Sequence, residues 1–109
     1  MEPRYSLRFE NGERKGETIP VPDGGLTTVG RKPGNTLQIL DNSVSGSHAQ
    51  LSADGAGITV KDTGSTNGTR VNGERILEKR LAHGDALAFG TVELRFTEAT
   101  LREIGRAHV

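Results

Sequence analysis

Short β-prone runs, each closed by a turn signal after a few residues, constrain the fold of this chain more than any other feature. In the first run, Tyr5, Leu7 and Phe9 alternate with polar residues, which is the period of a strand with one buried face. Asn11-Gly12 then gives a strong hairpin-turn signal. Similar runs follow along the chain, separated by turns to which many of the 15 glycines contribute. This rhythm is typical of an all-β domain, either a sandwich or a barrel.

Several segments are rich enough in β-prone residues to be expected as strands. They cover residues 5–10, 16–21, 26–29, 37–40, 48–52, 58–61, 86–89 and 92–97. Pro20 indicates that its strand lies at the edge of a sheet, because proline cannot donate to a neighbouring strand. We expect residues 1–97 to form one domain, because 109 residues suffice for a single core but not for two.

The remaining segment, residues 98–109, has a different pattern. Thr100 and Glu103 have the spacing of a helix capping box, and Leu101 and Ile104 would share one helical face. We expect this segment to be either a short closing helix or the start of a linker into a longer protein.

Composition argues against several classes of function. Fourteen basic residues balance 14 acidic ones, so the chain lacks the broad positive field of a nucleic-acid-binding protein. The absence of cysteine removes disulfides and thiolate metal sites, and the three histidines lack ligand spacing, so we expect no metal or cofactor. The sequence shows no secretion signal and no apolar run of membrane-spanning length. We therefore expect a cytoplasmic protein that binds neither nucleic acid nor membrane.

Three polar, glycine-containing segments are candidates for a binding surface. The longest, residues 63–73, reads Thr-Gly-Ser-Thr-Asn-Gly-Thr-Arg-Val-Asn-Gly and carries short side-chain donors on a backbone that can bend sharply. Taken alone, it is more simply a hairpin loop whose hydroxyls bond their own backbone. The other two are Gly30-Arg31 and Ser45-Gly46-Ser47-His48. If the three cluster at one end of a sandwich, they bring a guanidinium, hydroxyls and amides together, which is the chemistry that a phosphate dianion needs.

In their order and spacing, these segments resemble the forkhead-associated domain family. The matching pattern is Gly30-Arg31, Ser45 with His48 three residues later, and Ser65-Thr66-Asn67-Gly68-Thr69-x-Val71-Asn72-Gly73. The resemblance extends over residues 5–96. It implies a two-sheet sandwich of about eleven strands whose loops bind phosphothreonine in partner proteins, without catalytic activity.

The resemblance also implies a role for each matching residue. Those expected at the phosphopeptide are Arg31, Ser45, Gly46, Thr66 and Asn67, and those expected to structure the loops are Gly30, His48 and Gly68. Arg31 and the Ser45 hydroxyl would contact the phosphate, and Thr66 would complete its shell through the hydroxyl or the backbone amide. Asn67 would bond the peptide backbone. Gly30 would let the chain turn so that Arg31 faces outward, and His48 would brace the loops from beneath.

The chain departs from the family pattern at Gly46, where many members carry arginine or lysine. A hydrogen bond to a charged group contributes about 1.5–3 kcal/mol, so this loss lowers the expected phosphate affinity without abolishing it. The Gly46 amide can still donate. Lys32 is a conceivable substitute cation, although a solvated surface lysine is the simpler interpretation.

Two other chemistries receive little support. A Ser-His catalytic pair is disfavoured because Ser47 and His48 are neighbours, which point to opposite faces in a strand, and no carboxylate or oxyanion hole is identifiable. A nucleotide-binding P-loop needs a lysine before the hydroxyl residue, and residues 64–69 contain none. We therefore expect that the protein is not an enzyme.

Two functions from different classes remain. The first is an adaptor that recognises phosphothreonine in a partner protein within Ser/Thr-kinase signalling, and intact Arg31, Ser45, Thr66 and Asn67 favour it. The second is a structural or oligomerising relative with phosphate-independent contacts, which Gly46 favours. The sequence does not identify the partner or its kinase.

Overall fold

The computed structural model describes residues 3–99, and this part of the chain contains eleven strands and no helix. The strands are β1 (Tyr5–Phe9), β2 (Thr18–Val21), β3 (Gly24–Gly30), β4 (Leu37–Gln38), β5 (Ala49–Asp54), β6 (Ile58–Asp62), β7 (Thr69–Val71), β8 (Glu74–Ile76), β9 (Glu78–Arg80), β10 (Ala86–Phe89) and β11 (Val92–Glu98). The prediction of an all-β chain with about eleven short strands is confirmed. No helix in residues 3–99 is long and apolar enough to cross a membrane.

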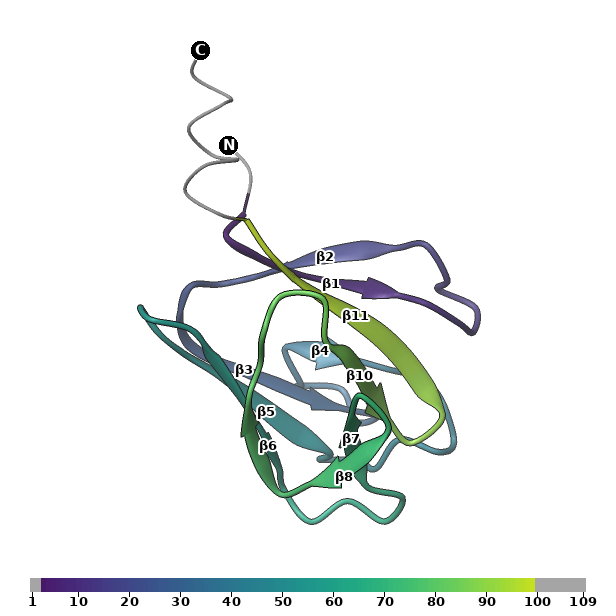
Figure 1. The fold of residues 1–109 in the computed structure, drawn as a ribbon. Helices are drawn as coiled ribbons and strands as arrows, with labels where there is room; N and C mark the ends of the chain where they lie inside the picture. Colours follow the sequence, from purple (N-terminus) through teal and green to yellow (C-terminus); the bar gives the residue numbers. More distant parts are fainter. Residues whose placement is uncertain (1–2, 100–109) are drawn as a thin grey trace.

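The strands form two separate sheets that face each other (Figure 1). The first has the order β2-β1-β11-β10-β7-β8, and the second has the order β4-β3-β5-β6-β9. All neighbouring strands are antiparallel except β3 and β4, which are parallel. The fold is therefore a sandwich and not a barrel. Pro20 lies in β2 at the edge of the first sheet, as predicted, and needs no donor on its outer side.

The core lies between the sheets and is built from alternate residues of the strands. In β1 the buried positions are Tyr5, Leu7 and Phe9, and β11 buries Leu94 and Phe96 in the same way. The rings of Tyr5 and Phe96 stack with centroids 5.8 Å apart. Because each strand contributes only one of its faces, a chain with 32% hydrophobic residues can fill the space between two sheets.

Several expected strands have bounds that differ from those observed, and β7, β8 and β9 were not expected. The strand expected over residues 37–40 ends at Gln38, because Asp41 N–H bonds to the carbonyl of Ile39 and turns the chain, leaving Leu40 exposed. Leu77 lies in solvent where the chain passes from β8 of one sheet to β9 of the other. The strand expected over residues 16–21 begins only at residue 18.

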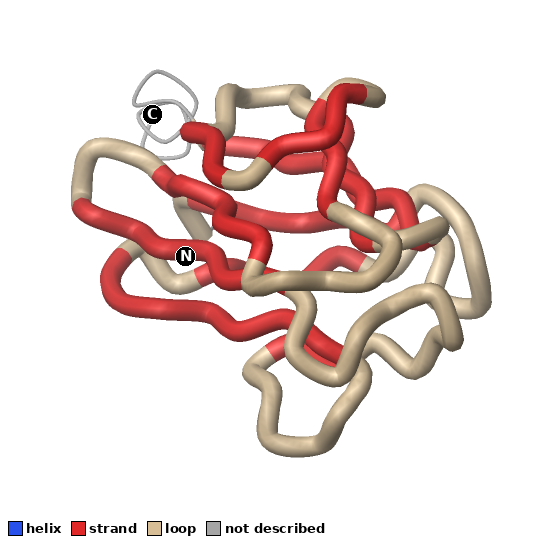
Figure 2. The backbone as a smooth tube through the Cα atoms, turned by 90° about the horizontal axis from the view of Figure 1, so that it is seen from below, coloured by secondary structure: helices blue, strands red, loops and turns tan. Residues whose placement is uncertain are grey.

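The described ends of the chain and the long loops lie at opposite ends of the sandwich. Ala99 N–H donates to the carbonyl of Arg4 at 2.8 Å, beside the start of β1 and the end of β11. The loops that follow β3, β4 and β6 gather at the other end, where Figure 2 shows them as tan segments beyond the strands. The division at residue 97 stays a prediction, and the expected capping box at residues 100–103 lies outside the described residues.

Tyr5 carries a buried hydroxyl that has no hydrogen-bond partner among residues 3–99. Burial, only partly offset by the Arg4 charge, raises the pKa of this hydroxyl. An unsatisfied buried hydroxyl costs free energy, whereas the ring itself packs well against Phe96.

We expect Tyr5→Phe to keep the free energy of unfolding unchanged or to raise it by about 1 kcal/mol, because it removes only the unpartnered oxygen. Denaturant unfolding measures this change. Tyr5→Leu is the control, and it should destabilise the domain because the stacked ring is lost. A loss above about 1 kcal/mol in Tyr5→Phe would contradict the absence of a partner.

Candidate functional site

Three loops meet at one end of the sandwich and form what we call the three-loop surface: residues 31–36, 39–48 and 63–68. Hydrogen bonds join each loop to the next. Arg31 N–H donates to the carbonyl of Ser45 at 2.9 Å, and Thr66 N–H donates to Ser45 Oγ at 3.0 Å. The structure thus brings together the three segments that the sequence singled out. Ser45 lies at their junction.

Arg31 is exposed, and its side chain is oriented by one hydrogen bond. Its Nε donates to the carbonyl of Val44 at 3.0 Å, while the two terminal Nη groups make no hydrogen bond within residues 3–99. The Arg31 carbonyl accepts from Gln38 Nε2 at 3.1 Å. The arrangement fixes the direction of the guanidinium and leaves its outer edge for a ligand, which suits the planar fork of an arginine.

Gly30 is needed for close packing between two of the loops. A Cβ atom on Gly30 would lie 2.1 Å from the Gly46 carbonyl oxygen and 2.6 Å from Asn35 Nδ2. The φ angle of Gly30 is not positive, so close packing and not a left-handed backbone requires glycine here. Any larger residue would push the loop that carries Ser45 away from β3.

His48 is fully buried and connects two loops from beneath. Its Nδ1 accepts the backbone N–H of Ser45 at 3.1 Å, so Nε2 must carry the hydrogen, which it donates to the carbonyl of Gly68 at 3.0 Å. The ring meets Phe89 edge-on, with centroids 5.6 Å apart. Both nitrogens are occupied by backbone groups, so His48 cannot act as a base toward Ser47, which is exposed.

Burial lowers the pKa of His48, although the bond to the Gly68 carbonyl and the charge of Asp62 partly oppose this shift. The ring is therefore neutral at pH 7. Protonation would place a second N–H against the amide of Ser45, so the bridge exists only with the neutral ring.

Asp62 organises the third loop, and the sequence analysis did not identify it. Its carboxylate accepts the backbone N–H groups of Gly64 at 2.8 Å and Ser65 at 2.9 Å. It also accepts the hydroxyls of Ser65 at 2.5 Å and Thr69 at 2.8 Å. Burial alone would raise the pKa of Asp62, but these hydrogen bonds prevail and lower it to about 2. The Asp-x-Gly-Ser order at residues 62–65 is the signal of an Asx turn that could have revealed this role.

The polar side chains of the third loop divide into two groups. The Ser65 and Thr69 hydroxyls are buried and bonded to Asp62, and Ser65 Oγ also accepts Gly68 N–H at 3.0 Å. Neither hydroxyl is therefore available to a ligand. Thr66 and Asn67, in contrast, are exposed. The interpretation of this segment as a loop whose hydroxyls bond within the loop thus applies to Ser65 and Thr69, but not to Thr66 and Asn67.

Thr66 and Asn67 each make one bond to the neighbouring loop. The Thr66 amide is occupied by Ser45 Oγ, so the hydroxyl is the group left to reach a ligand. Asn67 Nδ2 donates to the carbonyl of Ser43 at 2.8 Å, which holds the side chain and leaves its amide oxygen as an acceptor.

Gly68 turns the chain beneath these residues. It has φ +89°, a conformation that L side chains rarely adopt. Its carbonyl accepts Gly90 N–H at 3.1 Å in addition to the His48 ring. A side chain here would also meet the guanidinium of Arg75, because a Cβ would lie 2.8 Å from Nε.

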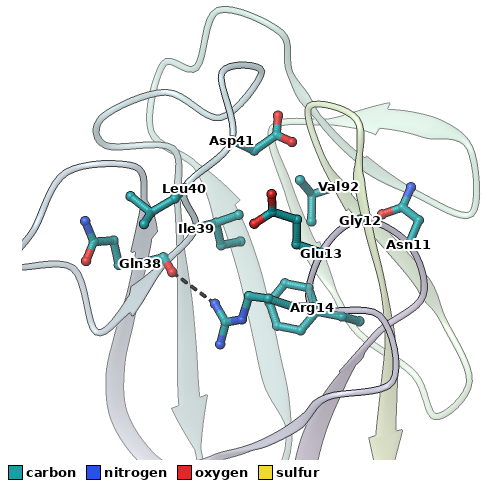
Figure 3. Close-up of a pocket in the computed structure, with 10 residues that line it drawn as sticks. Asn11, Gly12, Glu13, Arg14, Gln38, Ile39, Leu40, Asp41 and Val92 are labelled. Carbon is teal, nitrogen blue, oxygen red and sulfur yellow. Dashed lines mark hydrogen bonds between the residues drawn. The ribbon is translucent and has the colours of Figure 1, made fainter.

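A pocket of about 430 Å³ lies between the β1–β2 loop and the segment that follows β4 (Figure 3). Arg14 closes part of it by donating to the carbonyl of Gln38 at 3.1 Å. Glu13 and Asp41 line it with carboxylates, which disfavour an anion. None of the residues expected at the phosphopeptide lines this pocket, so the candidate site is the exposed three-loop surface.

The fold is a two-sheet sandwich whose loops at one end hold a guanidinium, hydroxyls and an amide side chain in fixed positions. The sequence profile of the FHA domain matches residues 27–90, which is more than half of the chain. The chain belongs to the FHA (forkhead-associated) domain family.

Curated relatives contain this domain within longer proteins. The chain is 34% identical over 90 residues to the ABC transporter ATP-binding/permease protein Rv1747 of Mycobacterium tuberculosis, covering 83% of this chain and 10% of that protein. It is 38% identical over 74 residues to the glycogen accumulation regulator GarA of Mycolicibacterium smegmatis, covering 68% of this chain and 47% of that protein. The chain therefore spans between a tenth and about half of these two relatives.

Solved structures agree with the fold. A structure determined for an analysis of phosphothreonine-dependent FHA domain interactions superposes with a TM-score of 0.81 at 30% identity, covering 89% of this chain and 98% of that one. The FhaA FHA domain complexed with the intracellular domain of Rv3910 gives a TM-score of 0.77 at 30% identity, covering 84% and 98%.

We expect Asp62→Ala to lower the free energy of unfolding by about 3 kcal/mol, because four donors lose a charged acceptor. Denaturant unfolding at pH 7 tests this, with Asp23→Ala as a control at an exposed position that makes no hydrogen bond within residues 3–99. Because the folded pKa lies below the usual 3.8, the contribution of Asp62 is present above about pH 4 and lost as the pH falls toward 2. The difference between Asp62→Ala and the native chain should shrink over that range, and a constant difference would contradict the ionic role.

We expect the stability of the native chain to fall as the pH drops below 6.5, because the unfolded chain takes up a proton at His48 before the folded chain does. This proton contributes a slope of at most about 1.4 kcal/mol per pH unit. Unfolding free energies between pH 7.5 and 5 should show a smaller slope in His48→Gln. Equal slopes in the native chain and in His48→Gln would rule out a buried neutral His48.

Proposed function

We propose that this chain is a phosphopeptide-binding module that recognises phosphothreonine in a partner protein through the three-loop surface. It would act as an adaptor in Ser/Thr-kinase signalling. The observation that carries the proposal is that accessible donors from three loops are held side by side by hydrogen bonds between the loops. The likeness to a domain studied for phosphothreonine-dependent interactions supports the same ligand.

Each proposed phosphate contact has a donor that the fold leaves available. Arg31 offers its terminal Nη groups, and Thr66 offers its hydroxyl. Ser45 Oγ already accepts the Thr66 amide, so its own hydrogen is directed to donate elsewhere. The Gly46 N–H has no acceptor within residues 3–99. A phosphate, with three acceptor oxygens and a charge of about −1.5 to −2, suits this set.

Asn67 has a different proposed role. Its side chain is a neutral amide that lies beside the groups proposed to bind the phosphate. Its amide is held by the Ser43 carbonyl and can accept a backbone N–H from an extended peptide. Such a contact would align the peptide across the loops. We also propose that the protein is a binding module without catalytic activity and acts in the cytoplasm. The buried Gly30, His48 and Gly68 would hold the loops without touching the peptide.

We expect a phosphothreonine peptide library to bind the domain and its unphosphorylated counterpart to bind at least 100-fold more weakly, because several charge-assisted hydrogen bonds are lost. Isothermal titration of one selected peptide and its unphosphorylated twin gives the ratio. Equal affinities would refute the proposal and favour the structural or oligomerising alternative, which Gly46 left open.

We expect Arg31→Ala to abolish phosphopeptide binding while changing the thermal midpoint little, because the guanidinium is exposed and makes one bond to the Val44 carbonyl. Arg8→Ala, at an exposed position on the outer face of β1, is the matched control and should bind normally. Retained affinity in Arg31→Ala would remove this residue from the site.

A further inference from the structure

We propose that Lys32 is a second phosphate-binding cation whose position depends on Gly46. This inference rests on the proposed function. Many family members carry a basic residue directly after the serine, where this chain has Gly46. We infer that Lys32, on the preceding loop, supplies that positive charge instead. The two residues would then act as a pair, in which the glycine provides the room and the lysine provides the ammonium.

The Lys32 side chain runs across the space where a residue-46 side chain would begin. A Cβ atom built on Gly46 would lie 2.8 Å from Lys32 Cε and 3.0 Å from both Cδ and Cγ. Three successive carbons of one stem therefore pass over the bare backbone of Gly46. A real Cβ essentially never shows the 2.8 Å distance, and the 3.0 Å distances are tighter than most real Cβ contacts, so a larger residue at position 46 would require the lysine stem to move.

The backbone fixes the root of this lysine against the same loop. Lys32 N–H donates to the carbonyl of Gly46 at 3.3 Å. Asn35 Nδ2 donates to the carbonyls of both Lys32 and Gly46, each at 2.9 Å. The absence of a Cβ at Gly30 allows this close approach. Lys32 is therefore anchored to the loop that carries Ser45, rather than extending from an independent segment.

The position of Lys32 fits the charge of the ligand. Arg31 precedes it directly and bonds to Ser45 through its backbone N–H, so both cations belong to the wall around Ser45. None of the ion pairs within residues 3–99 includes Lys32. A phosphate of about −1.5 to −2 is only partly neutralised by one guanidinium, and a compact ammonium on a flexible stem serves as a second point charge.

The first experiment removes the charge and keeps the stem. In Lys32→Met we expect the affinity for a phosphothreonine peptide without Asp or Glu to fall about 10-fold, and the dependence of affinity on salt to weaken. Binding of the unphosphorylated twin should not change. Lys32→Arg should retain most of the affinity. Lys79→Met, on the exposed strand β9, is the matched control and should bind as the native chain does.

The second experiment tests the pairing with Gly46. Gly46→Ala should weaken phosphopeptide binding by displacing the Lys32 stem, and the same change should cost nothing further when Lys32 is already alanine. Gly46→Arg should restore binding in the Lys32→Ala background, because it supplies a cation from the neighbouring position where the stem no longer occupies the space. Additive losses in the Lys32→Ala, Gly46→Ala double variant would contradict the pairing.

The outcomes separate this inference from the function on which it rests. If the native chain binds phosphorylated and unphosphorylated peptides equally, the proposed function fails. If the native chain binds phosphopeptide, Arg31→Ala abolishes binding and Lys32→Met stays within twofold of the native affinity, the site stands and the role of Lys32 is overturned. Unfolding curves for each variant establish that a loss of binding is not a loss of fold.

Discussion

The binding surface depends on one buried side chain that satisfies backbone groups from two loops. His48 accepts from Ser45 with one ring nitrogen and donates to Gly68 with the other, and it packs against Phe89 in the core. The same two loops are also linked by Thr66 N–H to Ser45 Oγ and by Asn67 Nδ2 to the carbonyl of Ser43, both exposed contacts. The bridge needs one tautomer of the neutral ring, so the geometry of the loops depends on the protonation state of His48. It also depends on core packing, because the ring lies against Phe89. Rigid support beneath an exposed site reduces the entropy lost on binding.

A second constraint decides which polar groups remain for a ligand. The carboxylate of Asp62 takes the Ser65 and Thr69 hydroxyls into the interior, whereas Thr66, between them in sequence, stays outside. A loop of chemically similar residues is thereby divided into a support and a recognition surface. The division follows from burial, because a hydroxyl removed from water needs a partner.

Sequence patterns predicted the long strands, but neither the short strands β7, β8 and β9 nor the contacts between loops. Alternation in β1 and β11 reflects one buried face per strand, and Pro20 identified an edge because its missing donor is a local property. The strands β8 and β9 have three residues each, and periodicity cannot show that the chain changes sheet between them. Asp62 was missed because its partners, although near in sequence, are recognised only once the loop closes around the carboxylate.

At the three-loop surface, glycines that lack a side chain leave room for charged side chains from other segments. Lys32 crosses the bare backbone of Gly46, and the guanidinium of Arg75 lies over Gly68 in the same manner. In both cases a glycine in a site loop admits a cation from a neighbouring segment. When the sequence is compared with the family pattern position by position, Gly46 counts as the loss of a basic side chain. Space that one residue vacates can be filled by another at a distance in sequence, so the electrostatics of such a site follow from packing and not from motif positions alone.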